Sequence, residues 1–174
     1  DASGNCYIAG SFTYSVLFDT THLTTTGSPT AISDMFIAKY DKDGNFVWLQ
    51  HPTHASNYGY NFSVNGMTID ANNMLTICGT GSYKIDFGNS VTVTGGPNGA
   101  FMAQFDASGK AQWAKEFYDK NGVGSFSANS IASDKNNNLL ITGTGSGQKT
   151  DFGGSGTVNF TGGYFIGKYD NNGA

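Results

Sequence analysis

Arginine is absent from this chain of 174 residues, and Glu116 is its single glutamate. The nine basic residues are therefore all lysines, and they are scattered along the chain, whose net charge is -4. Surfaces that bind nucleic acids gather Lys and Arg on one face, so this composition argues against such a surface. We expect no nucleic-acid partner.

Long apolar runs are also missing: no stretch approaches the roughly 20 apolar residues that span a bilayer, so we expect no membrane span. No signal peptide is visible, because the first ten residues are polar and rich in glycine. They resemble the middle of a repeat. The two cysteines, Cys6 and Cys78, fall at different positions of equivalent strands, three residues out of step. We expect buried free thiols rather than a disulfide.

Glycine and aromatic residues are abundant instead. The chain contains 25 Gly, 13 Phe and 9 Tyr, with many Asn, Ser and Thr, and only 13% of its residues are charged. Good helix formers are few, whereas residues typical of strands and turns are common. The composition predicts an all-β protein built from many short strands.

Two motifs recur along the chain. Residues 1–10, 70–79 and 134–143 each open with Asp and close with Gly. Residues 36–48 and 101–113 share the order Phe, Asp, Gly, Trp, and residues 165–174 repeat it until they stop before the Trp. The turn Asp recurs at positions 41, 106 and 170, which gives a period of about 65 residues. Repetition on this scale indicates a repeat architecture.

Each repeat is expected to hold four antiparallel strands joined by tight Asp, Asn and Gly turns, with a short ribbon between the second and third strands. Four-stranded units packed face to face predict a β-propeller of about two and a half blades. A β-sandwich is the alternative, but it does not explain the period. The predicted parts are one blade without its inner strand, one complete blade and one without its outer strand, at residues 1–55, 56–118 and 119–174.

The recurring pattern, read best in "FIAKYDKDGNFVW" at residues 36–48, resembles the SBBP repeat of seven-bladed β-propeller proteins secreted or displayed by bacteria. The resemblance covers nearly the whole chain. The second copy departs from it at Gln104 and Phe105, and the third at Gly167. These residues are structural, so the departures affect no chemistry.

The resemblance implies a section of a longer propeller in an extracellular or cell-surface protein, whose remaining blades are among its partners. Such repeats occur in exported proteins of Bacteroidetes, including cargo of type IX secretion. We expect a non-enzymatic interaction or scaffold module that binds a protein or a surface glycan. The alternative is a carbohydrate-binding or carbohydrate-active propeller, which predicts exposed aromatic platforms. Trp48 and Trp113 recur with the repeat, so we expect both indoles to be packed.

The segment that begins at Asp41 also resembles the start of a calcium loop. An EF-hand needs a bidentate Glu at its twelfth position, where this chain has Pro52. The sister turns lose the carboxylate of Asp43. A hairpin turn, with Asp41 accepting backbone N–H groups and Gly44 at positive φ, explains the pattern better.

Residues that do not repeat are the better candidates for function, mainly in Thr20–Ser33 and Gln50–Tyr60. Two histidines three apart could contribute to a metal site, but no third ligand is identifiable, so we expect loop residues and neither metal nor cofactor. The Asn residues of the inner strands could bind a polar ligand, although hydrogen bonds between blades are the preferred interpretation. The candidate contact residues are His22, His51, His54, Tyr58, Tyr60, Asn65 and Asn129.

Overall fold

The computed structural model describes residues 1–26, 33–54, 62–154 and 156–174. Within these ranges the chain forms strands and turns and no helix, so the all-β prediction is confirmed. It follows that the described segments contain no helix that is long and apolar enough to cross a membrane.

The first repeat contains a three-stranded antiparallel sheet, a separate hairpin and a short sixth strand. The sheet has the order β1-β4-β5, and the hairpin pairs β2 with β3. The strands are β1 (Cys6–Thr13), β2 (Ser15–Phe18), β3 (Thr21–Thr24), β4 (Ser33–Tyr40), β5 (Phe46–Gln50) and β6 (Thr53–His54).

The second repeat forms a four-stranded antiparallel meander in the order β7-β8-β11-β12, as the sequence predicts. The ribbon expected between its second and third strands is the hairpin β9–β10. The strands are β7 (Ser63–Ile69), β8 (Leu75–Gly81), β9 (Lys84–Asp86), β10 (Thr92–Thr94), β11 (Gly99–Phe105) and β12 (Ala111–Asp119).

The third repeat contains β13 (Ser125–Ser133), β14 (Leu139–Asp151) and β15 (Thr157–Tyr169), paired in that order. The far end of β14 also pairs with β12, which joins the second and third repeats into one sheet. The path β13-β14-β12-β11-β8-β7 curls until its two end strands meet, where Asn65 donates to the carbonyl oxygen of Ala128. These six strands form a nearly closed, barrel-like antiparallel sheet.

The Asp that opens each tight turn shapes it by accepting backbone N–H groups two and four residues further on. At Asp41 the donors are Asp43 and Asn45, over 2.9 and 2.8 Å, and Gly44 takes φ of +83°. The same pair of hydrogen bonds recurs in the other described turns of this kind. The hairpin interpretation of Asp41 is confirmed, since its carboxylate is used by the backbone.

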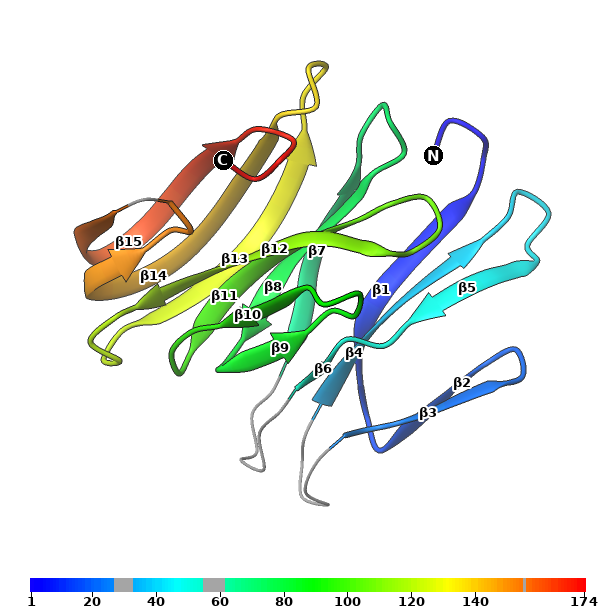
Figure 1. Cartoon of the computed structure of the whole chain (residues 1–174), viewed down its shortest axis with the longest axis horizontal. Helices are drawn as coiled ribbons and strands as arrows, with labels where there is room; N and C mark the ends of the chain where they lie inside the picture. The colour runs from blue at the N-terminus through cyan, green and yellow to red at the C-terminus, as the bar shows by residue number, and fades with distance from the viewer. Residues whose placement is uncertain (27–32, 55–61, 155) are drawn as a thin grey trace.

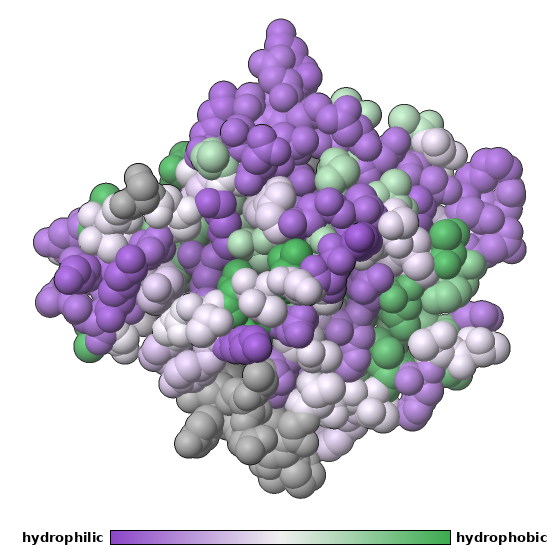
Figure 2. Space-filling view, in the orientation of Figure 1, coloured by the Kyte–Doolittle hydropathy of each residue, from purple (hydrophilic) through white to green (hydrophobic). Residues whose placement is uncertain are grey.

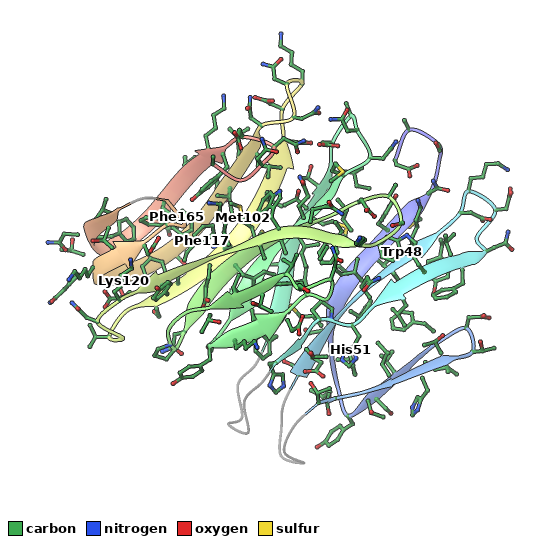
Figure 3. All side chains as sticks on the ribbon, in the orientation of Figure 1. Trp48, His51, Met102, Phe117, Lys120 and Phe165 are labelled. Carbon is green, nitrogen blue, oxygen red and sulfur yellow. The ribbon has the colours of Figure 1, made fainter. Side chains whose placement is uncertain are left out.

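Two hydrophobic cores lie between neighbouring repeats. One lies between the first and second repeats and contains Met35, Ile37, Ile77 and Phe101, and the other lies between the second and third. Figure 1 shows β1, β4 and β5 on one side of the molecule, β13 to β15 on the other, and the second repeat between them. In Figure 3, Met102, Phe117 and Phe165 gather in the second core. Each repeat thus buries its apolar residues against its neighbour.

The same tryptophan contact joins the repeats at both boundaries. The indole N–H of Trp48 donates to the carbonyl oxygen of Ala107 over 3.1 Å, and that of Trp113 donates to the carbonyl oxygen of Asn171 over 3.2 Å. Ala107 and Asn171 occupy the same position in the turns of successive repeats. Both indoles are half-buried against the cores, as expected from their recurrence.

A second contact also recurs at the two boundaries. Two residues at the end of one repeat pair antiparallel with the ribbon of the next: Thr53 and His54 pair with β9, and Tyr118 and Asp119 pair with β14. The boundary between repeats is therefore as regular as the repeats themselves.

Candidate functional site

Three ionisable side chains meet where the first repeat adjoins the second. Nε2 of His51 lies 3.0 Å from Oδ2 of Asp34, and Nε2 of His54 lies 3.1 Å from Oδ1 of the same carboxylate. Asp34 comes from β4, His54 from β6, and His51 follows directly after β5. Figure 3 labels His51 at this position. The structure thus brings together two of the predicted histidines around an aspartate that the sequence did not single out. We call these three residues the His–Asp–His cluster.

Asp34 is buried, with 1% of its surface exposed. Burial alone would raise the pKa of its carboxyl group. Hydrogen bonds from His51 and from the backbone N–H and hydroxyl of Thr26 outweigh that effect, so the pKa is lowered. The carboxylate is therefore held in its charged form by the fold.

His54 is buried as well, and its ring stacks on Phe62 at a centroid distance of 5.0 Å. Phe62 is fixed in turn by Ser33, whose hydroxyl accepts from its backbone N–H and donates to its carbonyl oxygen, both over 3.0 Å. Neither ring nitrogen of His54 has a hydrogen-bond partner among the residues that the structure describes. Its contact with Asp34 becomes an ion pair only when the imidazole is protonated. The expectation of loop histidines is wrong for His54, which is part of the protein interior.

Metal binding is not the role that this geometry favours. Asp34 lies between the two imidazoles, and its Oδ2 is already engaged by His51 and Thr26. Among the described residues no group of three or more His, Cys, Asp or Glu is arranged to hold a metal ion. The cluster is better described as a buried polar contact within the first repeat, beside its boundary with the second.

Glu116 occupies the position of His51 in the second repeat. It is buried against Gly95 and Gly99, where a Cβ atom would collide with its carboxyl group. Neither carboxyl oxygen has a hydrogen-bond partner within the described ranges, and burial raises the pKa of Glu116 to about 8. The chain thus holds its single glutamate in a neutral form near pH 7.

His22 lies apart from the cluster, on the exposed hairpin β2–β3. It stands directly across from Leu17, which is 64% exposed. The two side chains share the outward face of this hairpin, which we call the hairpin face. This pair combines an exposed apolar side chain with a polar ring.

The remaining predicted residues have different outcomes. Asn65 bridges to β13 through Ala128, which confirms its interpretation as a link between repeats. Asn129 is exposed, and its side-chain oxygen accepts from the hydroxyl of Ser127. Tyr58 and Tyr60 lie outside the described residues.

The cysteines are both free, as expected. Cys78 is buried, and burial raises the pKa of its thiol to about 12. Cys6 is exposed, so the expectation that both thiols are buried is wrong for Cys6. Its strand, β1, has the sheet β4–β5 on one side only.

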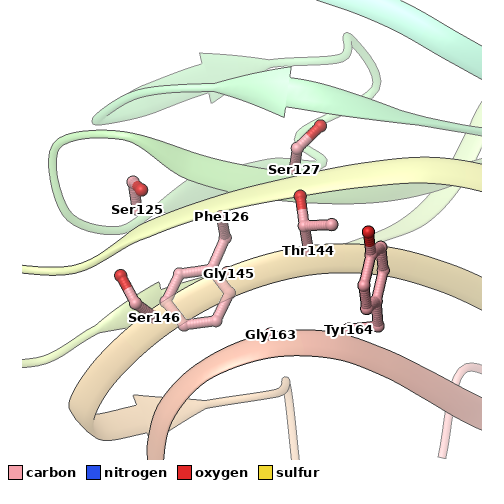
Figure 4. Close-up of a pocket in the computed structure, with 8 residues that line it drawn as sticks. All are labelled: Ser125, Phe126, Ser127, Thr144, Gly145, Ser146, Gly163 and Tyr164. Carbon is pink, nitrogen blue, oxygen red and sulfur yellow. The ribbon is translucent and has the colours of Figure 1, made fainter.

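An open hollow of about 460 Å³ lies on the third repeat. It is lined by hydroxyl groups of Ser and Thr, by Phe126, and by Tyr164, which is 87% exposed. Figure 4 shows the Tyr164 ring standing beside Thr144. A ring surrounded by hydroxyl groups can stack on an apolar face and hydrogen-bond at its edge.

Sequence reasoning missed Asp34 and Glu116. A signal existed for Glu116, because it is the only Glu in the chain and it replaces a candidate histidine at the same repeat position. For Asp34 the signal was weaker, since an Asp next to a strand is usually a turn residue. No family model matches the chain, and no curated protein matches it.

Proposed function

We propose that this chain is a non-enzymatic interaction or scaffold module in which β-propeller blades, formed by the repeats, present non-repeated loops to a partner. The observation that carries the proposal is the recurrence of the tryptophan contact at both boundaries between repeats. Residues that recur in this way hold the repeats together. The residues that do not recur are therefore the candidates for binding a partner.

The blade interpretation is supported by the antiparallel strands within each repeat and by the two hydrophobic cores between neighbouring repeats. The pairing of β12 with β14 involves only two residue pairs, at the end of each strand, and the same contact joins β6 to β9. It is therefore a boundary contact between neighbouring blades. The resemblance to secreted and surface repeats supports an extracellular or cell-surface location.

The hairpin face supports an interaction role. Leu17 and His22 lie opposite each other on the hairpin β2–β3. Figure 1 shows this hairpin projecting from the sheet β1-β4-β5. Exposed pairs of this kind can anchor a protein partner, because the apolar side chain loses water on binding while the imidazole hydrogen-bonds. We therefore propose the hairpin face, with Leu17 and His22, as the main contact surface.

The experiment is capture with chemical cross-linking from the secreted and surface proteins of the organism that encodes the chain. We expect a protein that cross-links to β2–β3 and is lost from the variant Leu17→Ser/His22→Ser. Val123→Ser is the matched control, because Val123 is 76% exposed elsewhere on the surface. Capture that is equal for all three proteins, or that never maps to the hairpin, contradicts the proposal.

The hollow beside Tyr164 supports a second candidate function, carbohydrate binding. Titration with soluble glycans, followed by amide shifts of Thr144 and Ser146, tests it. Loss of those shifts in Tyr164→Ala would favour the glycan function, and their absence in the unmodified chain excludes it. The indoles give this function no support, since both are packed against neighbouring repeats.

A further inference from the structure

At both boundaries between repeats, the tryptophan of one repeat contacts a turn of the next repeat. Trp48 lies over Gly109, where a Cβ atom would come 2.9 Å from the indole, and Trp113 lies over Gly173 in the same way, at 3.2 Å. Both glycines have positive φ, +84° and +78°. We call the turn glycine, together with the carbonyl oxygen that accepts the indole N–H, the indole seat.

A third indole seat exists in the first repeat, and it is empty. Gly44 takes φ of +83° in the equivalent turn, yet among the described residues, its two chain neighbours aside, no atom lies within 4 Å of the place where its Cβ would stand. A hollow of about 460 Å³ opens at this point, lined by Tyr40, Gly44, Asn45 and Phe46 with Asp19. The turn is built like the two occupied ones and differs in having no indole above it.

The apolar residues around this seat are uncovered as well. Ile8 is 37% exposed, whereas its counterparts Ile77 and Ile141 are fully buried. Tyr40 and Phe46 are partly exposed, and their counterparts in the second repeat lie in the core against the first repeat. Figure 2 shows hydrophobic surface at the right-hand edge of the molecule, over β5 and the hairpin β2–β3. In the part of the chain that the structure describes, this face lacks the neighbour that covers it in the other repeats.

The edge of β2 provides a third observation. β2 is the counterpart of β9, which pairs with β10 on one side and receives β6 from the preceding repeat on the other. Within the described ranges, β2 pairs with β3 alone. Its second edge can therefore accept a short antiparallel strand.

The two hairpins that fill the occupied seats share a second feature. The tryptophan stands directly across from a long polar side chain on the neighbouring strand: Lys39 pairs with Trp48, and Gln104 pairs with Trp113. These polar side chains reach the same turn, since Lys39 Nζ donates to the carbonyl oxygen of Ala107 and Gln104 Nε2 to Oδ1 of Asn171. The occupant is thus a hairpin with Trp opposite Lys or Gln.

We propose that the Gly44 seat, with Ile8, Tyr40, Phe46 and the edge of β2, binds the Trp-bearing hairpin of one further repeat of this kind. The proposal rests on the function proposed above, and it identifies one partner of the repeats as a further repeat of the same kind. A second copy of this chain is a poor occupant, because both of its indoles already fill seats of their own.

The test adds one repeat in register. Because Asp70 follows Ile69 and aligns with Asp1, a second copy of residues 1–69 placed before Asp1 continues the repeat and supplies one additional tryptophan. The readouts are the Hα shifts of Gly44, taken by NMR, and the melting temperature of Gly44→Asn. Asn tolerates positive φ, so this variant probes mainly the space above the turn.

In the chain of 174 residues we expect Gly44→Asn to lower the melting temperature less than Gly109→Asn does, since only Gly109 lies under an indole. In the extended chain the two losses become equal, and Gly44 Hα moves upfield under the added ring. Replacing the added Trp with Ala is the matched control, and it restores the original values.

Three outcomes overturn the proposal: an added segment that stays unfolded, one that folds while Gly44 is unchanged, and dimerisation of the original chain that Gly44→Asn abolishes. The last would make a second copy the occupant. A different result, equal losses for Gly44→Asn and Gly109→Asn in the original chain, would instead refute the proposed frame.

Discussion

Trp48 donates its indole N–H to the carbonyl oxygen of Ala107 over 3.1 Å, although the two residues are 59 positions apart in the chain. Trp113 and Asn171 repeat the relationship across 58 positions. An interaction that recurs with the period of the sequence is part of the repeat itself. It explains why a turn glycine and a tryptophan recur together in this chain, because the tryptophan of one repeat lies over the turn glycine of the next.

Replacing Trp48 or Trp113 with Phe keeps an aromatic ring and removes the N–H donor. We expect each variant to lose about 1 kcal/mol or more of the free energy of unfolding, because the hydrogen bond of the indole N–H and part of the ring packing are both lost. Urea denaturation measures the loss. Val47→Thr, an exposed change on the same strand, should stay within about 0.5 kcal/mol. Losses no larger than this control would contradict the structural role of the indoles.

Glu116 should make stability fall as the pH rises. Its pKa in the folded protein is about 8, above its ordinary value of 4.5, so the folded state binds the proton more tightly. Its contribution is complete below pH 4.5 and is lost between pH 4.5 and 8, with a slope of up to about 1.4 kcal/mol per pH unit. Glu116→Gln should flatten this slope. Unfolding curves measured across this pH range would refute the burial argument if the variant and the original chain stayed parallel.

Asp34 should make the stability of the folded protein fall at acidic pH. Its pKa is lowered in the folded protein, so its contribution is present above the ordinary value of 3.8 and is lost as the pH falls through the folded value. Asp34→Asn should cost about 1–3 kcal/mol near neutral pH, because the hydrogen bonds of His51 and Thr26 lose their charged acceptor. The variant should also lose less stability on acidification than the original chain does. Equal acid sensitivity would show that Asp34 is not the group responsible.

Chelator should leave the protein unchanged. Asp41 already accepts two backbone N–H groups, and Asp43 is an exposed residue that pairs with Lys42. We expect Asp43→Ala to change stability by less than about 0.5 kcal/mol, and Gly44→Val to lower the melting temperature, because a β-branched residue is strained at positive φ. A melting temperature that falls with chelator, and no longer does so in Asp43→Ala, would restore the calcium interpretation.

Much of the fold could be predicted from local signals. The Asp and Gly of each turn specify a hairpin through short-range hydrogen bonds, so the strands on either side of Gly44 and Gly109 were predictable from the sequence. These features depend on residues a few positions apart.

The candidate site was harder to predict, because it depends on contacts between residues that are far apart in the sequence. Asp34 and His54 are 20 positions apart and meet only when β4 and β6 have folded. In the sequence, Glu116 resembles an ordinary surface residue, because its burial depends on contact with Gly95 and Gly99 in the folded chain. The empty seat at Gly44 is visible only by comparison with its two occupied counterparts.

The most direct test of the repeat frame is a NOESY spectrum of the unmodified chain, read at the Hα protons of Gly44, Gly109 and Gly173. The structure predicts cross-peaks from the Trp48 ring to Gly109 and from the Trp113 ring to Gly173, with ring-current upfield shifts at both. Gly44 should show neither. If the three glycines shared one Hα shift, and no cross-peak reached an indole, the repeats would not be joined in the way described.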